Sequence, residues 1–68
     1  MTVEYDQKTD LLYLRLDPRS QQVTNQRVAE DVVLDIGREE KIVGIEIMNA
    51  SRNLDLQQLL PVGFEKVR

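Results

Sequence analysis

Apolar and polar residues alternate over two segments near the N-terminus, residues 2–6 and 11–16. Successive side chains of a β-strand point to opposite faces of a sheet, so this period of two predicts two half-buried strands. The polar run 7–10 between them is typical of a turn. Pro18 cannot donate a ladder hydrogen bond and therefore ends the second strand. These residues are thus expected to form a β-hairpin.

A second hairpin is predicted by the β-branched, apolar runs 32–36 and 42–48. The turn between them, residues 37–40, begins with Gly37, which permits a positive φ angle. The polar segment that precedes this hairpin predicts only a short strand, about residues 23–28.

Near the C-terminus the apolar period changes from two to three and four, which predicts a short helix over about residues 52–60. Ser51 or Asn53 is expected to cap its N-terminus, and Pro61 ends it. The tail 61–68 is expected either to be loose or to add an edge strand.

Together these elements predict a single α+β domain spanning residues 1–68. Its antiparallel sheet of four to five strands covers about residues 2–48 and is built from successive hairpins. The short C-terminal helix packs on one face, because two helical turns are not stable alone. The predicted core face comprises Val3, Tyr5, Leu12, Leu14, Leu16, Val32, Leu34, Ile36, Val43, Ile45 and Ile47, covered by Leu56, Leu59 and Leu60.

The opposite face of the predicted sheet is more apolar than a face exposed to water requires. A contiguous apolar patch rimmed by charge is typical of an interaction surface, although single surface hydrophobics need no explanation. We therefore predict an interaction surface on this face, which we call the mixed face. Its candidate residues are Leu11, Tyr13, Arg15, Val33, Asp35, Ile42, Glu46 and Met48.

A length of 68 residues allows one domain with a small core. Domains of this size usually gain stability from disulfides, a metal or a second copy of themselves. The sequence has no Cys and no His, which excludes disulfides, thiolate or imidazole metal sites, and nucleophiles that depend on Cys or a His base. Self-association remains, so we expect a homo-oligomer, most simply a dimer formed through the mixed face or an edge strand.

Twelve acidic and nine basic residues give a formal net charge of −3, which is unfavourable for binding nucleic-acid phosphates. Two Tyr and one Phe are too few for a base-stacking surface. No apolar stretch approaches the ~20 residues of a membrane-spanning helix, and the N-terminus lacks the layout of a signal peptide. We therefore expect a cytoplasmic protein without a direct nucleic-acid or membrane partner, in keeping with the absence of Cys.

Arg15, Asp35 and Glu46 are predicted to share one sheet face. Two neighbouring carboxylates can act as acid and base or bind Mg²⁺ or Ca²⁺, while the arginine binds an anionic substrate. Alternatively, Arg15 pairs with one acid across strands and water solvates the other acid. A small sheet has little volume for a pocket unless two subunits build it. We therefore predict no catalytic, cofactor or metal residues, and retain a small ligand- or metal-binding enzyme at a subunit interface as the alternative.

Gly44 interrupts a strand of β-branched residues, which lowers stability unless something approaches its backbone closely. A β-bulge, the ring of Tyr13 or a partner chain would each explain it, and we favour the ring or the partner.

Several blocks together resemble a known family of small prokaryotic proteins, the domain of unknown function 2283. They are Tyr5-Asp6, residues 10–16, Val33-Leu34-Asp35, residues 43–47 and Ala50-Ser51, and the likeness covers about residues 3–54. The resemblance implies a compact sheet with a C-terminal helix in a bacterial or archaeal cytosol, and no established activity. Family members more usually carry glycine near the position of Glu40.

The resemblance also suggests a partner, because family members are sometimes suggested to be encoded beside small toxin-like proteins. Our leading hypothesis is a non-catalytic protein-interaction module that self-associates, and an antitoxin-like partner of another small protein is its most concrete form.

Overall fold

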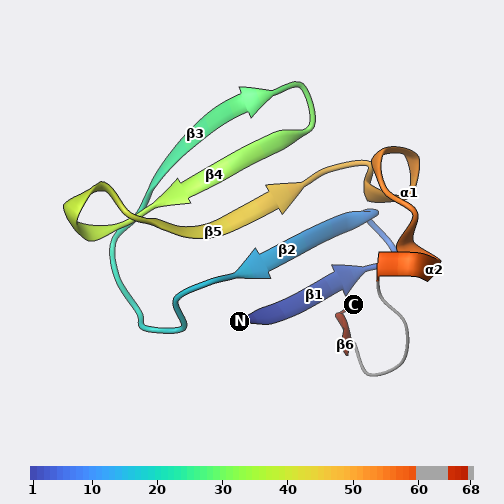
Figure 1. Cartoon of the computed structure of the whole chain (residues 1–68), viewed down its shortest axis with the longest axis horizontal. Coiled ribbons are helices and arrows are strands. Elements are labelled where there is room, and N and C mark those ends of the chain that lie inside the picture. The colour runs from blue at the N-terminus through green and yellow to red at the C-terminus, as the bar shows by residue number, and fades with distance from the viewer. Residues whose placement is uncertain (60–64, 68) are drawn as a thin grey trace.

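The computed structural model describes the backbone of residues 1–59 and 65–67 and the side chains of residues 1–58. Its strands are β1 (Thr2–Asp6), β2 (Leu11–Arg15), β3 (Thr24–Ala29), β4 (Val32–Ile36), β5 (Ile42–Ile47) and β6 (Glu65–Val67). They form one sheet in the order β3-β4-β5-β2-β1-β6 (Figure 1). Strands β5 and β2 therefore lie at the centre of the sheet.

Strands β1 to β5 pair antiparallel with one another, which confirms the antiparallel sheet predicted from the alternating pattern. Strand β3 occupies the polar segment in which a short strand was expected. Strand β6 lies in the tail and pairs parallel with β1, so this part of the tail is an edge strand.

Two short helices, α1 (Ala50–Asn53) and α2 (Leu56–Leu59), replace the single helix predicted over 52–60. Leu54 is extended, with φ −135° and ψ 150°, and this interrupts the helical path. The Asp55 carboxylate then accepts a hydrogen bond from the Gln58 backbone N–H at 3.4 Å. Aspartate is a favoured N-cap residue, so a second helix begins after it.

The capping role predicted for Ser51 or Asn53 is wrong. Asn49 holds the N-cap position in the left-handed conformation, with φ 51°, and its side chain makes no capping hydrogen bond. The acceptor comes from the β1–β2 turn instead, because the Ser51 backbone N–H and hydroxyl both donate to the Asp10 carboxylate. Periodicity along one segment gives no signal for an acceptor supplied by a distant turn.

The core lies at the end of the sheet where the two helices meet the strands (Figure 1). Leu12 and Ala50 are fully buried there. The half-buried side chains packed against them are Val3, Tyr5, Leu14, Ile47, Leu54 and Leu56. Leu56 therefore contacts the core as expected, whereas Leu59 and Leu60 lie outside the described side chains.

A β-bulge in β5 exchanges the predicted faces of two residues. Asp35 pairs with Gly44 but Ile36 pairs with Ile42, so Val43 is an inserted residue. Ile42 consequently shares the face of Ile36, whereas Val43 is buried on the face of Asp35. Both predicted placements are wrong, because strict alternation takes no account of an inserted residue.

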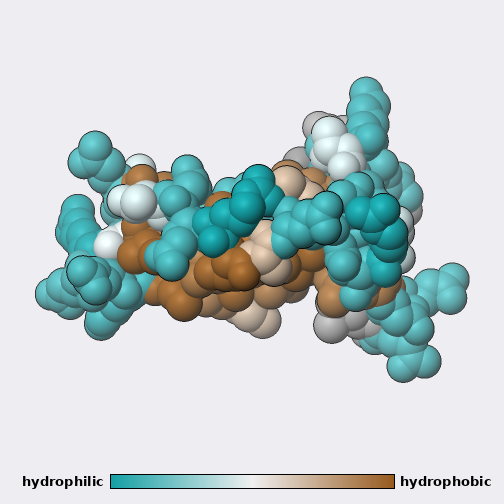
Figure 2. Space-filling model, turned by 90° about the horizontal axis from the view of Figure 1, so that it is seen from above, coloured by the Kyte–Doolittle hydropathy of each residue, from teal (hydrophilic) through white to brown (hydrophobic). Residues whose placement is uncertain are grey.

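The other apolar residues of the predicted core face do share one side of the sheet. Leu14 and Leu34 both pair with Ile45, and Val3 pairs with Leu14, so these four form a row across it. Figure 2 shows hydrophobic residues gathered along one long side of the molecule. We call this side the apolar face. Its residues are Val3, Tyr5, Leu12, Leu14, Leu16, Val32, Leu34, Ile36, Ile42, Ile45 and Ile47.

Strand β3 forms one edge of the sheet, and all six of its residues are exposed. Its register shifts between Arg27 and Ala29, which leaves Val28 as an inserted residue with 51% of its surface exposed. The Arg27 guanidinium donates a hydrogen bond to the Glu30 backbone carbonyl. This edge is therefore irregular and polar.

Gly37, in the turn between β4 and β5, does not adopt the positive φ angle for which glycine was expected there. Gly37 has φ −102°, and the positive φ angles fall on Glu39 (56°) and Glu40 (57°). A Cβ atom at Gly37 would lie 2.2 Å from Oε1 of Gln21. Gly37 thus leaves room for the Gln21 side chain in its present position.

Replacing Glu40 by glycine is expected to raise the free energy of unfolding by about 0.5 to 1 kcal/mol. The reason is that the left-handed conformation strains any residue with a Cβ atom. Urea denaturation measures the change. Glu40→Ala removes the same charge but keeps the Cβ atom, so an equal gain from alanine would show that backbone strain is not the cause.

Candidate functional site

The structure brings most of the predicted interaction residues together. The registers place Leu11, Tyr13, Arg15, Val33, Asp35 and Glu46 on one face of the sheet. Met48 directly follows β5, whereas Ile42 lies on the apolar face through the bulge. The role of the mixed face in binding a partner stays a prediction.

Asp35 is the centre of a buried polar cluster on the mixed face. Its side chain is on β4, and the residue has only 7% of its surface exposed. The Tyr13 hydroxyl on β2 donates to Oδ2 at 2.8 Å, and the Asn25 amide on β3 donates to Oδ1. Burial and the hydrogen bond to Asp35 raise the pKa of Tyr13 to about 12. Asn25 was not predicted, because the polar sequence of β3 gives no signal for its register.

The Tyr13 ring lies over the backbone of Gly44. A Cβ atom at Gly44 would be 1.9 Å from the Tyr13 hydroxyl oxygen, so only glycine fits beneath the ring. Of the three explanations offered for this glycine, the structure shows the Tyr13 ring and also a β-bulge directly before Gly44, whereas a partner chain stays a prediction. The Arg15 guanidinium lies 5.1 Å from the centre of the same ring, within the range of a cation–π contact.

Arg15 pairs with neither Asp35 nor Glu46, the two acids that were predicted to share its face. Its Nη2 lies 3.5 Å from the Glu4 carboxylate on the neighbouring strand β1. Cross-strand registers explain this choice, because Glu4 pairs with Tyr13 and stands diagonally beside Arg15.

Glu46 and Asp35 form a pair of neighbouring carboxyl groups. Burial raises the pKa of Glu46, and the neighbouring Asp35 carboxylate raises it further. The described residues contain no group of three or more acidic, His or Cys side chains placed to hold a metal ion. Both oxygens of Asp35 already accept hydrogen bonds from side chains. The pair is therefore suited to retaining a proton within the sheet.

A raised pKa in the folded state predicts how stability depends on pH. The folded protein holds the Glu46 proton above the ordinary pKa of 4.5. The stabilisation is complete below that value and is lost as pH rises through the raised pKa. Replacing Glu46 by glutamine is therefore expected to flatten the fall in melting temperature between pH 4.5 and neutrality.

Thermal melts across this pH range, followed by circular dichroism, test the expectation. Glu39→Gln removes an acid from the exposed β4–β5 turn and should keep the wild-type profile. Asp10, Asp17 and Asp31 have lowered pKa values, so their contributions are lost below pH 3.8, outside the range tested. A Glu46→Gln profile parallel to that of the wild type would contradict the raised pKa of Glu46.

Two other carboxylates tie α1 to the sheet. Asp10 accepts hydrogen bonds from the hydroxyls of Tyr5 at 2.6 Å and Ser51 at 2.7 Å, and these bonds lower its pKa. Asp31, at the β3–β4 turn, accepts a bond from the Asn53 amide at 2.9 Å, which lowers the pKa of Asp31. Their roles are explained by attachment of the helix.

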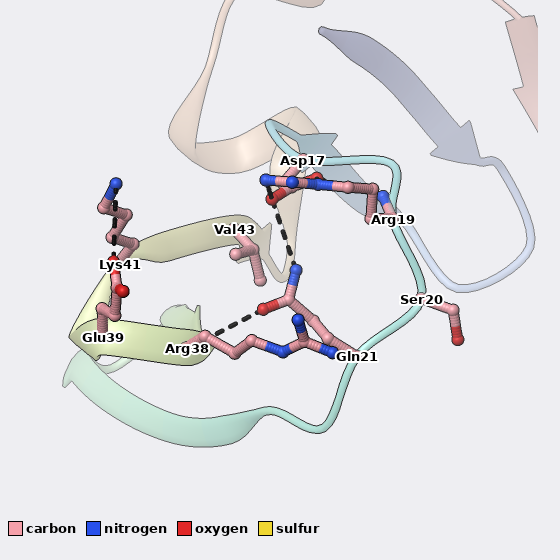
Figure 3. Close-up of a pocket in the computed structure, with 8 residues that line it drawn as sticks. All are labelled: Asp17, Arg19, Ser20, Gln21, Arg38, Glu39, Lys41 and Val43. Carbon is pink, nitrogen blue, oxygen red and sulfur yellow. Dashed lines mark hydrogen bonds and ion pairs between the residues drawn. The ribbon is translucent and has the colours of Figure 1, made fainter.

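A groove runs beneath the loop that connects β2 to β3. One part has a volume of about 430 Å³ and is lined by Asp17, Arg19, Ser20, Gln21, Arg38, Glu39, Lys41 and Val43 (Figure 3). A second part, of about 370 Å³, shares five of these residues and reaches Tyr13, Arg15 and Asp35. The groove therefore joins the polar cluster of the mixed face to the β4–β5 turn.

Hydrogen bonds hold the two walls of the groove together. The Arg19 guanidinium donates to both oxygens of Asp17, at 3.0 and 2.8 Å. The Gln21 amide donates to Asp17 at 3.3 Å, and its carbonyl oxygen accepts from the Arg38 backbone N–H at 3.0 Å. Figure 3 shows Gln21 between the loop and the turn. The loop and the β4–β5 turn are thus joined through Gln21.

A protein-family model described as "Protein of unknown function (DUF2283)" matches residues 2–51. No curated protein and no solved structure matches the chain. Within the described part of the chain, the helices are too short and too polar for any of them to cross a membrane.

Proposed function

Because the chain belongs to the DUF2283 family, whose description assigns no activity, we propose a function from the fold itself. The protein is a non-catalytic interaction module that self-associates as a dimer through the apolar face of its sheet. This proposal moves the interface from the mixed face to the opposite side.

The observation that carries the proposal is the incomplete burial of the apolar face. Leu14, Ile45 and Leu34 cross its centre and are only half-buried. Leu16 and Ile42 at its rim keep 40% and 44% of their surface exposed. Helices α1 and α2 lie at one end of the sheet (Figure 1). An apolar surface of this extent favours contact with another apolar surface over contact with water.

A second copy of the chain is the occupant that best fits this face. The molecule measures 34 × 26 × 20 Å, so its broad side is comparable to the ~800 Å² that each partner contributes to a standard interface. Two sheets pack face to face at about 10 Å through interdigitating apolar side chains. Among the described residues, just Leu12, Val43 and Ala50 are buried apolar residues, so each copy would gain a core from the other.

The mixed face is a weaker candidate for the interface. Its centre holds Asp35, with hydrogen bonds from Tyr13 and Asn25. Covering that cluster would also remove Arg15 and Glu4 from water, and desolvating charges opposes association unless the partner supplies matching groups. The apolar face carries no such cost.

Sedimentation equilibrium of the full chain at tens of micromolar tests the proposal. We expect a species of twice the 7.9 kDa chain mass. A monomer with a cooperative thermal transition would overturn the dimer. The apolar face would then have to bind a different protein, and an antitoxin-like role requires such a partner.

A further inference from the structure

The cations that line the groove differ in how far they are neutralised by neighbouring acids. Four of the nine basic residues of this net acidic chain lie along it: Arg15, Arg19, Arg38 and Lys41. Arg19 is bound to Asp17, and Arg15 is paired with Glu4. The positive charge that remains available is therefore at the β4–β5 turn.

Arg38 and Lys41 supply that available charge. Within the described part of the chain, the Arg38 guanidinium has no ion-pair or hydrogen-bond partner. Lys41 lies 3.9 Å from Glu39, and both side chains are more than three-quarters exposed. An exposed pair at this distance contributes little free energy, so Lys41 can readily exchange its partner.

The groove holds these cations beside a prearranged wall. Gln21 joins the loop to the turn, and Gly37 allows that approach because it has no side chain. Val43, inserted by the bulge, is buried and lines the same cavity. A cavity of about 430 Å³ is within the range of pockets that bind small molecules.

We propose that this groove binds a small organic oxyanion, a carboxylate or a phosphate, through Arg38 and Lys41. The planar guanidinium of Arg38 can donate two parallel hydrogen bonds to either group, and the ammonium of Lys41 adds a point charge. Arg19 makes two hydrogen bonds to Asp17 and forms part of the wall. The site lies on the side of the sheet opposite the apolar face, so binding is compatible with the proposed dimer and independent of it.

Amide NMR titration of the full chain tests this site. Sodium phosphate and sodium citrate are added separately, with sodium chloride at matched ionic strength as the reference. We expect saturable shifts confined to the amides of residues 17, 19–21 and 37–43 with at least one of the two anions. The anion that binds more tightly assigns the ligand class. Shifts that do not saturate, or that follow every basic residue of the chain, would overturn the proposal.

Two charge-removing variants sharpen the test. Arg38→Gln and Lys41→Gln should each weaken anion binding by about tenfold, because each removes one charge-assisted contact. Both side chains are exposed, so the folded spectrum should persist. Lys8→Gln removes the same charge from the β1–β2 turn and should bind as the wild type does. Equal losses in Arg38→Gln and Lys8→Gln would show a non-specific charge effect and overturn the site.

Discussion

Replacing Ile45 by lysine is expected to convert the proposed dimer into a monomer. Ile45 pairs with Leu14 on one side and Leu34 on the other, so it occupies the middle of the apolar face. A lysine there would place an unpaired ammonium between two apolar sheets, and burying an uncompensated charge is costly. We expect the dissociation constant to rise by about 100-fold or more, equivalent to about 2.7 kcal/mol.

Sedimentation velocity across a dilution series measures this change. Because Ile45 is half-buried within one copy, Ile42→Lys serves as a second variant at an exposed position on the same face. Val28→Lys is the matched control, since Val28 is also exposed but lies in the β3 bulge. A dimer that survives both apolar-face changes and dissociates with Val28→Lys would place the interface at the sheet edge instead.

Replacing Gly44 by alanine is expected to lower the free energy of unfolding by about 2 to 3 kcal/mol. The new methyl group would meet the hydroxyl end of Tyr13 at 1.9 Å, so the ring must move away. Moving it breaks the hydrogen bond to Asp35, which is buried. The cost therefore combines steric strain with an unsatisfied buried acceptor.

A double-mutant cycle isolates the cause of this loss. Gly44→Ala is compared in the wild type and in a Tyr13→Ala background, where no ring lies over the strand. The alanine at 44 should cost less than about 0.5 kcal/mol in that background, because the two sites are then no longer coupled. Chemical denaturation provides all four stabilities. An equal cost in both backgrounds would show that the ring does not explain the glycine.

The period of two was sufficient to predict the sheet. It identified β1, β2, β4 and β5, and the row of Val3, Leu14, Leu34 and Ile45 lies on one face as alternation requires. Alternation failed at Val43. This inserted residue places Val43 and Ile42 on the faces opposite to those predicted. A bulge depends on pairing with a distant strand, so a single segment does not reveal it.

The candidate site was predictable in part for the same reason. Tyr13, Asp35 and Glu46 share a face because each lies at a regular strand position. Asn25 and the groove depend on how the polar loop before β3 folds back over β5, and composition does not encode that path. The capping prediction for the helical segment failed for a different reason. Asp10, which accepts the hydrogen bond from Ser51, lies in a turn 41 residues away in the sequence.

The irregular β3 edge is a poor template for the addition of a further strand. A regular exposed edge offers a ladder on which further strands can add without end, as in fibrils. The inserted Val28 and the side chain of Arg27 interrupt that ladder. Contact through the apolar face, by contrast, consumes the same surface on both copies and obeys twofold symmetry. In the proposed dimer, neither the apolar face nor the β3 edge would therefore offer a surface for adding a third copy.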